Sequence, residues 1–88
     1  MYVYLLTRQE GDDGGYDSFD SCVVVANSAK DARKIHPESI WSPNDVTENT
    51  SDPFDDTWPS PNAIDVECIG VADKKMKRGV VCASFNAG

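Results

Sequence analysis

Residues 19–35 read FDSCVVVANSAKDARKI, and this stretch decides the fold. Its first half, Phe19–Ala26, holds a continuous apolar run that is typical of a central strand, covered on both faces or paired on both sides. Its second half begins at Ser28, and Asp31 follows at the spacing of a helix-capping box. The stretch therefore predicts a strand that passes almost directly into a helix.

The helix has one narrow apolar face. Ala29, Ala32 and Ile35 recur every three residues, whereas Lys30, Arg33 and Lys34 are expected to be solvated. Pro37 ends the helix, because the residue before a proline is pushed out of helical geometry. We expect a helix of about eight or nine residues, too short to be stable without packing against a sheet.

Three more strands are expected around this unit. Tyr2–Thr7 is rich in aromatic and apolar residues and forms the first strand. Ile64–Ala72 and Val80–Phe85 form the third and fourth strands, and Asp73–Gly79 is the turn across which they pair in antiparallel fashion.

The segment 37–63 contains all five prolines, both tryptophans and no sustained periodicity, so it is predicted to be one long irregular loop. The expected order of elements is β-β-α-loop-β-β. This order predicts a single α+β domain over residues 1–88, in which one short helix packs on one face of a four-stranded antiparallel sheet.

Negative charge is concentrated on the expected loops. All but four of the 15 acidic residues fall in the segments 10–20 and 38–56, neither of which contains Lys or Arg, and the formal net charge is −7. Such clustering predicts a surface that meets a cationic partner. A Trp in the long loop either anchors that loop on the core or is a partner-binding anchor. The candidate partner-binding residues are Asp12, Asp13, Asp17, Asp20, Trp41, Asp45, Asp52, Phe54, Asp55, Asp56 and Trp58.

One compact basic segment, the expected turn with Lys74, Lys75, Lys77 and Arg78, supports an alternative. In that alternative the protein sequesters a signalling nucleotide. The basic turn holds the phosphates, Phe85 stacks on the base and Asn86 reads the edge of the base. Direct binding of nucleic acid is disfavoured, because the surrounding negative field weakens phosphate contacts and no row of stacking aromatic residues is present.

The residues offer no catalytic signature. Cys22, Cys68 and Cys82 are odd in number and lack ligand spacing, which argues against a disulfide framework and against a zinc site with His36. A thiol buried in a strand is inert, and His36 is expected to be a helix cap or an exposed side chain. We therefore expect a protein that is not an enzyme and has no metal or cofactor. Neither a signal peptide nor a long apolar run is present, so we expect no membrane contact and a cytosolic location.

Motifs such as YLLTR at 4–8, GYDSFDS at 15–21 and the terminal SFNAG at 84–88 resemble those of a family of small, mostly uncharacterised phage and prophage proteins. The resemblance runs over nearly the whole chain, and the terminal SFNAG at 84–88 is its most specific part. The other segments that carry it are YLLTR at 4–8, GYDSFDS at 15–21, VVA at 24–26, AR at 32–33, HP at 36–37, a Trp, IGVA at 69–72 and GVVCA at 79–83. The resemblance implies an accessory phage gene that acts in the bacterial cytosol, in a class where inhibitors of host defence such as anti-CRISPR proteins are frequent.

Charge and resemblance together predict a non-catalytic phage-encoded inhibitor of a bacterial defence system. Its acidic loops would occupy a positively charged, nucleic-acid-binding surface of a host protein, such as a CRISPR effector, in the cytoplasm of the bacterial host. The protein would act as a monomer or a homodimer. The alternatives are the nucleotide-sequestering module and an accessory phage protein without an inhibitory role.

Overall fold

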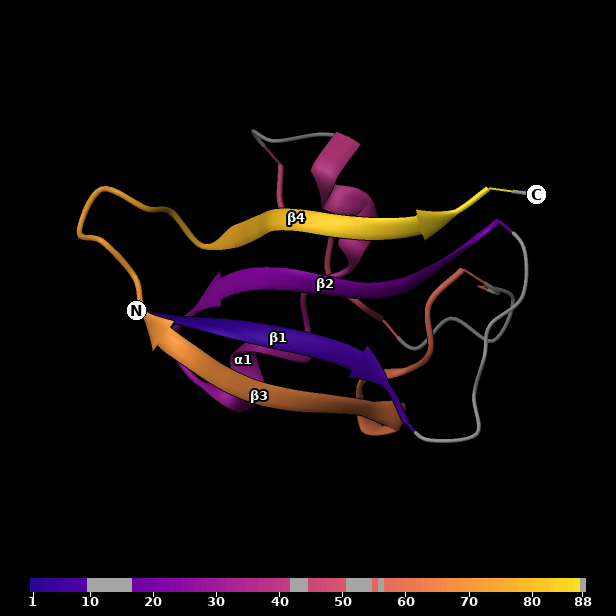
Figure 1. The fold of residues 1–88 in the computed structure, drawn as a ribbon, viewed down its shortest axis with the longest axis horizontal. Helices are drawn as coiled ribbons and strands as arrows, with labels where there is room; N and C mark the ends of the chain where they lie inside the picture. The colour runs from indigo at the N-terminus through magenta and orange to yellow at the C-terminus, as the bar shows by residue number, and fades with distance from the viewer. Residues whose placement is uncertain (10–16, 42–44, 51–54, 56, 88) are drawn as a thin grey trace.

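The computed structural model describes residues 1–9, 17–41, 45–50, 55 and 57–87. Four strands, β1 (Tyr2–Arg8), β2 (Ser18–Ala26), β3 (Ile64–Val71) and β4 (Gly79–Asn86), form one antiparallel sheet (Figure 1). A short helix, α1 (Ala29–Ala32), and two 3-10 turns, η1 (Pro37–Trp41) and η2 (Pro61–Ala63), complete the regular elements of this part of the chain. The predicted α+β architecture is confirmed. The predictions for Asp12, Asp13, Asp52, Phe54 and Asp56 lie outside the described residues.

The strand order is β3-β1-β2-β4, which makes β2 a central strand, as its apolar run predicts. The register sets Tyr4 opposite Val24 and Leu6 opposite Cys22. All four side chains are buried, because opposed residues in a sheet point to the same face. The centre of the core is therefore built on the two middle strands.

The expected pairing of the third and fourth strands is wrong. β3 pairs with β1 and β4 pairs with β2, so the last two strands lie at opposite edges of the sheet. The segment 72–78 passes across one end of the sheet, where the N–H of Ala72 donates to the carbonyl of Met1 (3.1 Å) (Figure 1).

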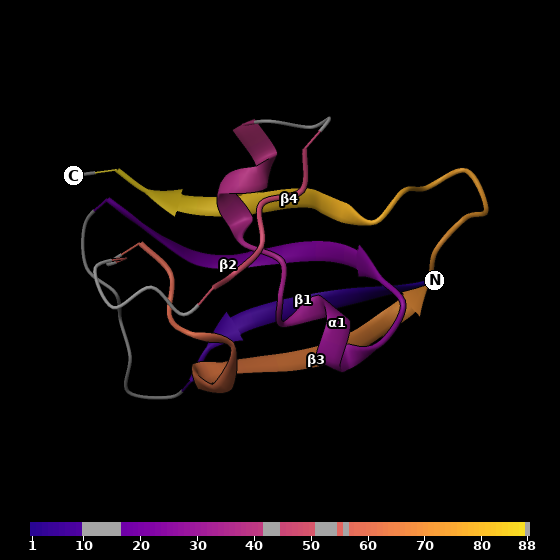
Figure 2. The ribbon, with the colours of Figure 1, turned by 180° about the vertical axis from the view of Figure 1, so that it is seen from behind.

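The helix and both 3-10 turns cover one face of the sheet (Figure 2). Fully buried Ile35 and Ile64 pack in the same cluster as Leu6, Phe19 and Val24. Each such side chain contributes about 1.5–3 kcal/mol to stability when it leaves water. Because Ile35 lies just after α1, its burial in this cluster holds the loop after α1 on the sheet.

The helix is shorter than its apolar spacing predicts. Ser28 caps it through its hydroxyl, which accepts from the N–H of Asp31 (3.1 Å), and Asp31 accepts from the N–H of Asn27 (3.1 Å). The chain then leaves the helix, because the backbone at 34–36 pairs with 47–49. The backbone N–H of His36 donates to the carbonyl of Thr47 (2.8 Å), and the backbone N–H of Asn49 donates to the carbonyl of Lys34 (2.6 Å). Of the expected apolar face, Ala32 and Ile35 are buried but Ala29 is exposed.

Candidate protein-binding site

Two aromatic side chains from different predicted sites come together at the surface. Trp41, the last residue of η1, is 64% exposed, and Phe85 of β4 is 39% exposed. Their ring centroids lie 5.4 Å apart in an edge-to-face arrangement. The ring of Phe19, almost fully buried, lies 4.9 Å from Phe85 and 5.4 Å from Trp41. We call Trp41 and Phe85, together with the Phe19 ring that supports them, the aromatic patch.

A β-bulge brings Phe19 into this position. Phe19 lies opposite Phe85, and the register shifts between Phe19 and Ser21. In a regular strand Phe19 and Cys22 would point to opposite faces, because they are an odd number of residues apart. The extra residue at Asp20 sends both side chains into the core, as bulges commonly re-aim a side chain. The patch therefore rests on a buried ring instead of on a mobile side chain.

Exposed acidic residues are close to the residues of the aromatic patch along the chain. Asp17 and Asp20 are exposed on either side of Phe19 along the chain, and the N–H of Asp17 donates to the carbonyl of Asn86 at the end of β4 (2.5 Å). Glu38 is exposed three residues before Trp41, and side chains at this spacing lie on the same side of a 3-10 turn. The predicted residue Asp45 is also exposed but lies further along, in a cleft beside Val80 and Val81.

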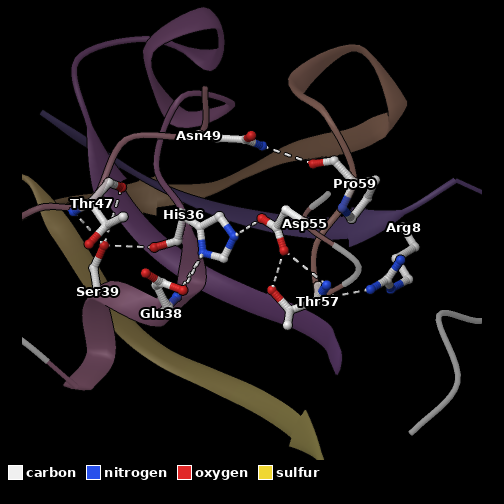
Figure 3. A network of polar contacts seen from close by, with 9 residues as sticks. All are labelled: Arg8, His36, Glu38, Ser39, Thr47, Asn49, Asp55, Thr57 and Pro59. Carbon is white, nitrogen blue, oxygen red and sulfur yellow. Dashed lines mark hydrogen bonds and ion pairs between the residues drawn. The ribbon is translucent and has the colours of Figure 1, made fainter. Parts of the chain in front are cut away.

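A buried histidine holds the loop that carries Trp41 (Figure 3). His36 is 4% exposed, so the expectation of an exposed side chain at a helix end is wrong. Its Nδ1 accepts from the N–H of Glu38 (3.1 Å), and its Nε2 lies 2.6 Å from Oδ2 of Asp55. A neutral imidazole has one N–H donor and one acceptor nitrogen. Because Nδ1 accepts, the N–H at Nε2 is the donor of the hydrogen bond to Asp55. Both ring nitrogens are therefore occupied by structural contacts.

Asp55 is engaged inside the protein. Its Oδ1 accepts from the N–H (2.9 Å) and the hydroxyl (2.6 Å) of Thr57. Burial alone would raise the pKa of Asp55, but the hydrogen bonds from Thr57 and His36 outweigh it and hold the pKa below its ordinary value. This carboxylate is committed to the loop, so we remove Asp55 from the partner-binding set.

The same network fixes η1. The hydroxyl of Ser39 donates to the carbonyl of His36 (2.7 Å) and accepts from the N–H of Thr47 (2.9 Å). The side-chain amide of Asn49 donates to the carbonyl of Pro59 (2.9 Å). These contacts join η1 to two later parts of the long loop, and they position Trp41 at its end. No short motif in the sequence announces this network, although the Asp-x-Thr spacing at 55–57 is typical of an Asx turn.

The second tryptophan is part of the core. Trp58 is 2% exposed, and the guanidinium carbon of Arg8 lies 5.6 Å from the centroid of its ring. Arg8 also donates to the carbonyls of Phe19 and Thr57 (both 2.8 Å), which ties the end of the loop to β1 and β2. Trp58 therefore anchors the loop and offers no surface to a partner, and we remove it from the partner-binding set.

The residues of the predicted nucleotide site do not form one site. The Lys74–Arg78 turn precedes β4, whereas Phe85 and Asn86 lie at the far end of that strand, about 24 Å away at about 3.4 Å per residue. Arg78 also donates to Asp31 (3.0 Å) and Glu48 (2.8 Å), and these hydrogen bonds, above all those to Glu48, raise its pKa. One nucleotide cannot contact both ends, and the guanidinium of Arg78 is already occupied by carboxylates.

The cysteines do not converge. Cys22 is buried, and burial raises the pKa of its thiol to about 12, with a smaller contribution from Cys82. Cys68 and Cys82 are exposed on the two edge strands. Within the residues that the structure describes, no three His, Cys, Asp or Glu side chains lie close enough to hold a metal ion. No helix in the same part of the chain is long and apolar enough to cross a membrane.

Comparison of the chain with protein-family models, with curated protein sequences and with solved structures gives no match. The functional argument therefore depends on the geometry described above.

Proposed function

We propose that this protein is a non-catalytic binding protein whose aromatic patch docks on the surface of another protein. The observation that carries the proposal is the exposed edge-to-face pair of Trp41 and Phe85 over the buried ring of Phe19. Tryptophan is enriched among the residues that dominate binding energy, and a supported ring loses little conformational entropy on binding. The hydrogen bonds around His36 and Ser39 support this interpretation, because they hold η1 in place before any partner arrives.

The charge beside the patch favours a basic partner. Asp17, Asp20 and Glu38 are exposed and lie within three residues of Phe19 or Trp41 along the chain, and the chain has a formal net charge of −7. Such a field speeds the encounter with a positive surface and disfavours acidic partners. A basic surface of this kind is typical of proteins that bind nucleic acid. Together with the resemblance to phage proteins, this favours an inhibitor of a bacterial defence system, such as a CRISPR effector, in the host cytoplasm.

The test is affinity capture from bacterial lysate with the immobilised protein, followed by quantitative mass spectrometry. Trp41→Ala and Phe85→Ala should each reduce the recovery of the captured partner by about tenfold or more, because a central aromatic anchor contributes that much. Recovery by the unaltered protein should also fall as salt rises.

The matched control is Ile69→Ala, which removes an exposed apolar side chain (52% exposed) from the opposite edge strand. It should leave capture unchanged. Equal capture by Trp41→Ala and by the unaltered protein would rule out the aromatic patch as the binding site. Circular dichroism of each variant checks that the fold is retained.

A further inference from the structure

A second surface feature lies away from the aromatic patch. An open pocket of about 360 Å³ is formed between α1, the turn that follows it and η2. Its walls are made by Lys30, Arg33, Lys34, Glu48, Asn49, Pro61 and Asn62. The pocket is on the covered side of the sheet, where α1 and the turn that leads into β3 lie (Figure 2). Its volume falls within the range of about 300–1,000 Å³ that small-molecule sites occupy.

The pocket gathers positive charge in an acidic protein. Lys30, Arg33 and Lys34 are three of the eight Lys and Arg residues of the chain. Lys30 and Lys34 are exposed, and within the described residues neither ammonium group has an ion pair or a side-chain hydrogen bond, although Lys34 helps to lower the pKa of Asp31. Arg33 donates through Nη1 to the carbonyls of Pro61 (3.2 Å) and Ile64, which are neutral acceptors. Its charge is not compensated by these contacts.

The acidic groups closest to the pocket are held elsewhere. Glu48 lines the pocket, but its carboxylate accepts from Nη1 (2.8 Å) and Nη2 (3.2 Å) of Arg78. Asp31 of α1 accepts from Nε of the same arginine (3.0 Å). The guanidinium of Arg78 offsets one of these two negative charges, so Lys30, Arg33 and Lys34, counted together with Arg78, Asp31 and Glu48, still leave the region with a net charge of +2. Such a concentration of one sign in a concave surface attracts anions.

The walls of the pocket also indicate what kind of ligand would fit beside the charged groups. The methylene stems of the lysines and of Arg33, with the ring of Pro61, supply apolar surface below the charged heads. The side-chain amides of Asn49 and Asn62 add polar groups at the edge. We propose that this pocket binds a small organic anion, with an apolar body against Pro61 and a phosphate or carboxylate group held by Lys30, Arg33 and Lys34. The inference does not depend on the proposed protein-binding function.

The test is isothermal titration calorimetry with four probes: phenyl phosphate, benzoate, inorganic phosphate and neutral benzyl alcohol. Phenyl phosphate or benzoate should bind, more tightly than benzyl alcohol, and the affinity should fall as salt rises. Tighter binding of phenyl phosphate than of benzoate would assign a phosphate, and the reverse order would assign a carboxylate. Inorganic phosphate should bind more weakly than phenyl phosphate, because it lacks the apolar body.

The double variant Lys30→Gln/Lys34→Gln should weaken binding of the anionic probe by about tenfold or more, since charge-assisted hydrogen bonds are the strong ones. The matched control is Lys74→Gln/Lys75→Gln, which removes the same charge from two exposed lysines outside the pocket and should change the affinity by less than about twofold. In the unaltered protein, amide chemical shifts on titration should move at Lys30–Lys34 and at Asn62 and Ala63, but not at Trp41 or Phe85. Absence of binding by both organic anions, equal losses in the two double variants, or shifts confined to other residues would overturn the proposal.

Discussion

At the scale of single residues, the most constrained group is His36. Its ring is buried, and each nitrogen has one partner: the N–H of Glu38 for Nδ1 and the carboxylate of Asp55 for Nε2. An Asp–His pair of this kind resembles the orienting half of a catalytic site. A base, however, needs a nitrogen that can take up a proton from a substrate, and here Nδ1 faces a backbone donor. The pair therefore connects η1 to the later part of the loop.

This geometry predicts an acid-sensitive contribution to stability from Asp55. Because the folded-state pKa of Asp55 lies below its ordinary value, the stabilisation is present above that ordinary value and is lost as the pH falls from about 5 through the folded-state pKa. Asp55→Asn should lower the free energy of unfolding by about 1–3 kcal/mol at neutral pH. The difference from the unaltered protein should shrink in acid. Urea unfolding at neutral and at acidic pH measures both effects.

The pH dependence will not vanish in Asp55→Asn. Asp31 also has a lowered pKa, because its hydrogen bonds with Arg78 and Asn27 outweigh the opposing effect of its burial, and it loses its contribution in the same direction. Asp45→Asn is the control, because Asp45 is exposed and has no polar contact within the described residues. Unfolding curves of Asp55→Asn that follow those of the unaltered protein at every pH would contradict the assignment.

At the scale of elements, the sequence predicts where the strands lie better than it predicts which strands pair and where the helix ends. The runs in β1 and β2 combine β-branched and aromatic residues, and they become strands because burial and local preference agree. The apolar spacing of Ala29, Ala32 and Ile35 continues past the real end of α1. Ile35 is buried there by pairing of its segment with Glu48, a contact between residues far apart in sequence that periodicity does not reveal.

In the candidate sites, too, the outcome depends on contacts between residues that are far apart in the sequence. Trp41 and Trp58 both lie in the proline-rich segment 37–63, but one is exposed and the other buried. The difference comes from Arg8, which lies over the ring of Trp58, and from η1, which ends at Trp41. The basic residues at 74–78 form a cluster in the sequence, whereas the cationic pocket is formed by three residues that were expected to be solvated. The sequence shows which aromatic and basic side chains are present, but tertiary contacts decide which of them come together in a site.

Arg78 is the clamp between elements, and its removal should loosen α1. It joins Asp31 of the helix to Glu48 of the bridge that follows, from its position just before β4. Arg78→Met should lower the free energy of unfolding by about 1–2 kcal/mol, a modest value because the ions are partly exposed to solvent. Lys77→Met, at an exposed neighbour, should have little effect. Chemical unfolding at low and high salt measures the difference, which should decrease with salt; equal stability of the two variants would contradict the clamp.

At the scale of the whole molecule, the features that carry positive charge are separated from the aromatic patch. The aromatic patch lies at one end of β4, the exposed lysines lie before its other end, and the cationic pocket lies beside α1 and η2. The lysines and the patch are separated because the turn precedes β4 and Phe85 lies near the end of that strand. The sheet order sends β3 and β4 to opposite edges. A β3–β4 hairpin would instead have brought Ile69 and its edge next to β4, and would have changed which strands are central.

The topology makes a sharp prediction for hydrogen exchange and cross-strand contacts. Amides of β1 and β2 should exchange most slowly, because both strands are paired on both sides, whereas alternate amides of β3 and β4 face outward. Nuclear Overhauser effects should join Leu5 to Glu67 and Val23 to Cys82, the pairs that the register sets opposite each other. The competing hairpin would give contacts between the strands 64–71 and 79–86. One of these strands would then be paired on both sides, and all of its amides would be protected from exchange. Because the two arrangements share the same strand boundaries, the cross-strand contacts and the exchange pattern distinguish them, and contacts between β3 and β4 would overturn the observed order.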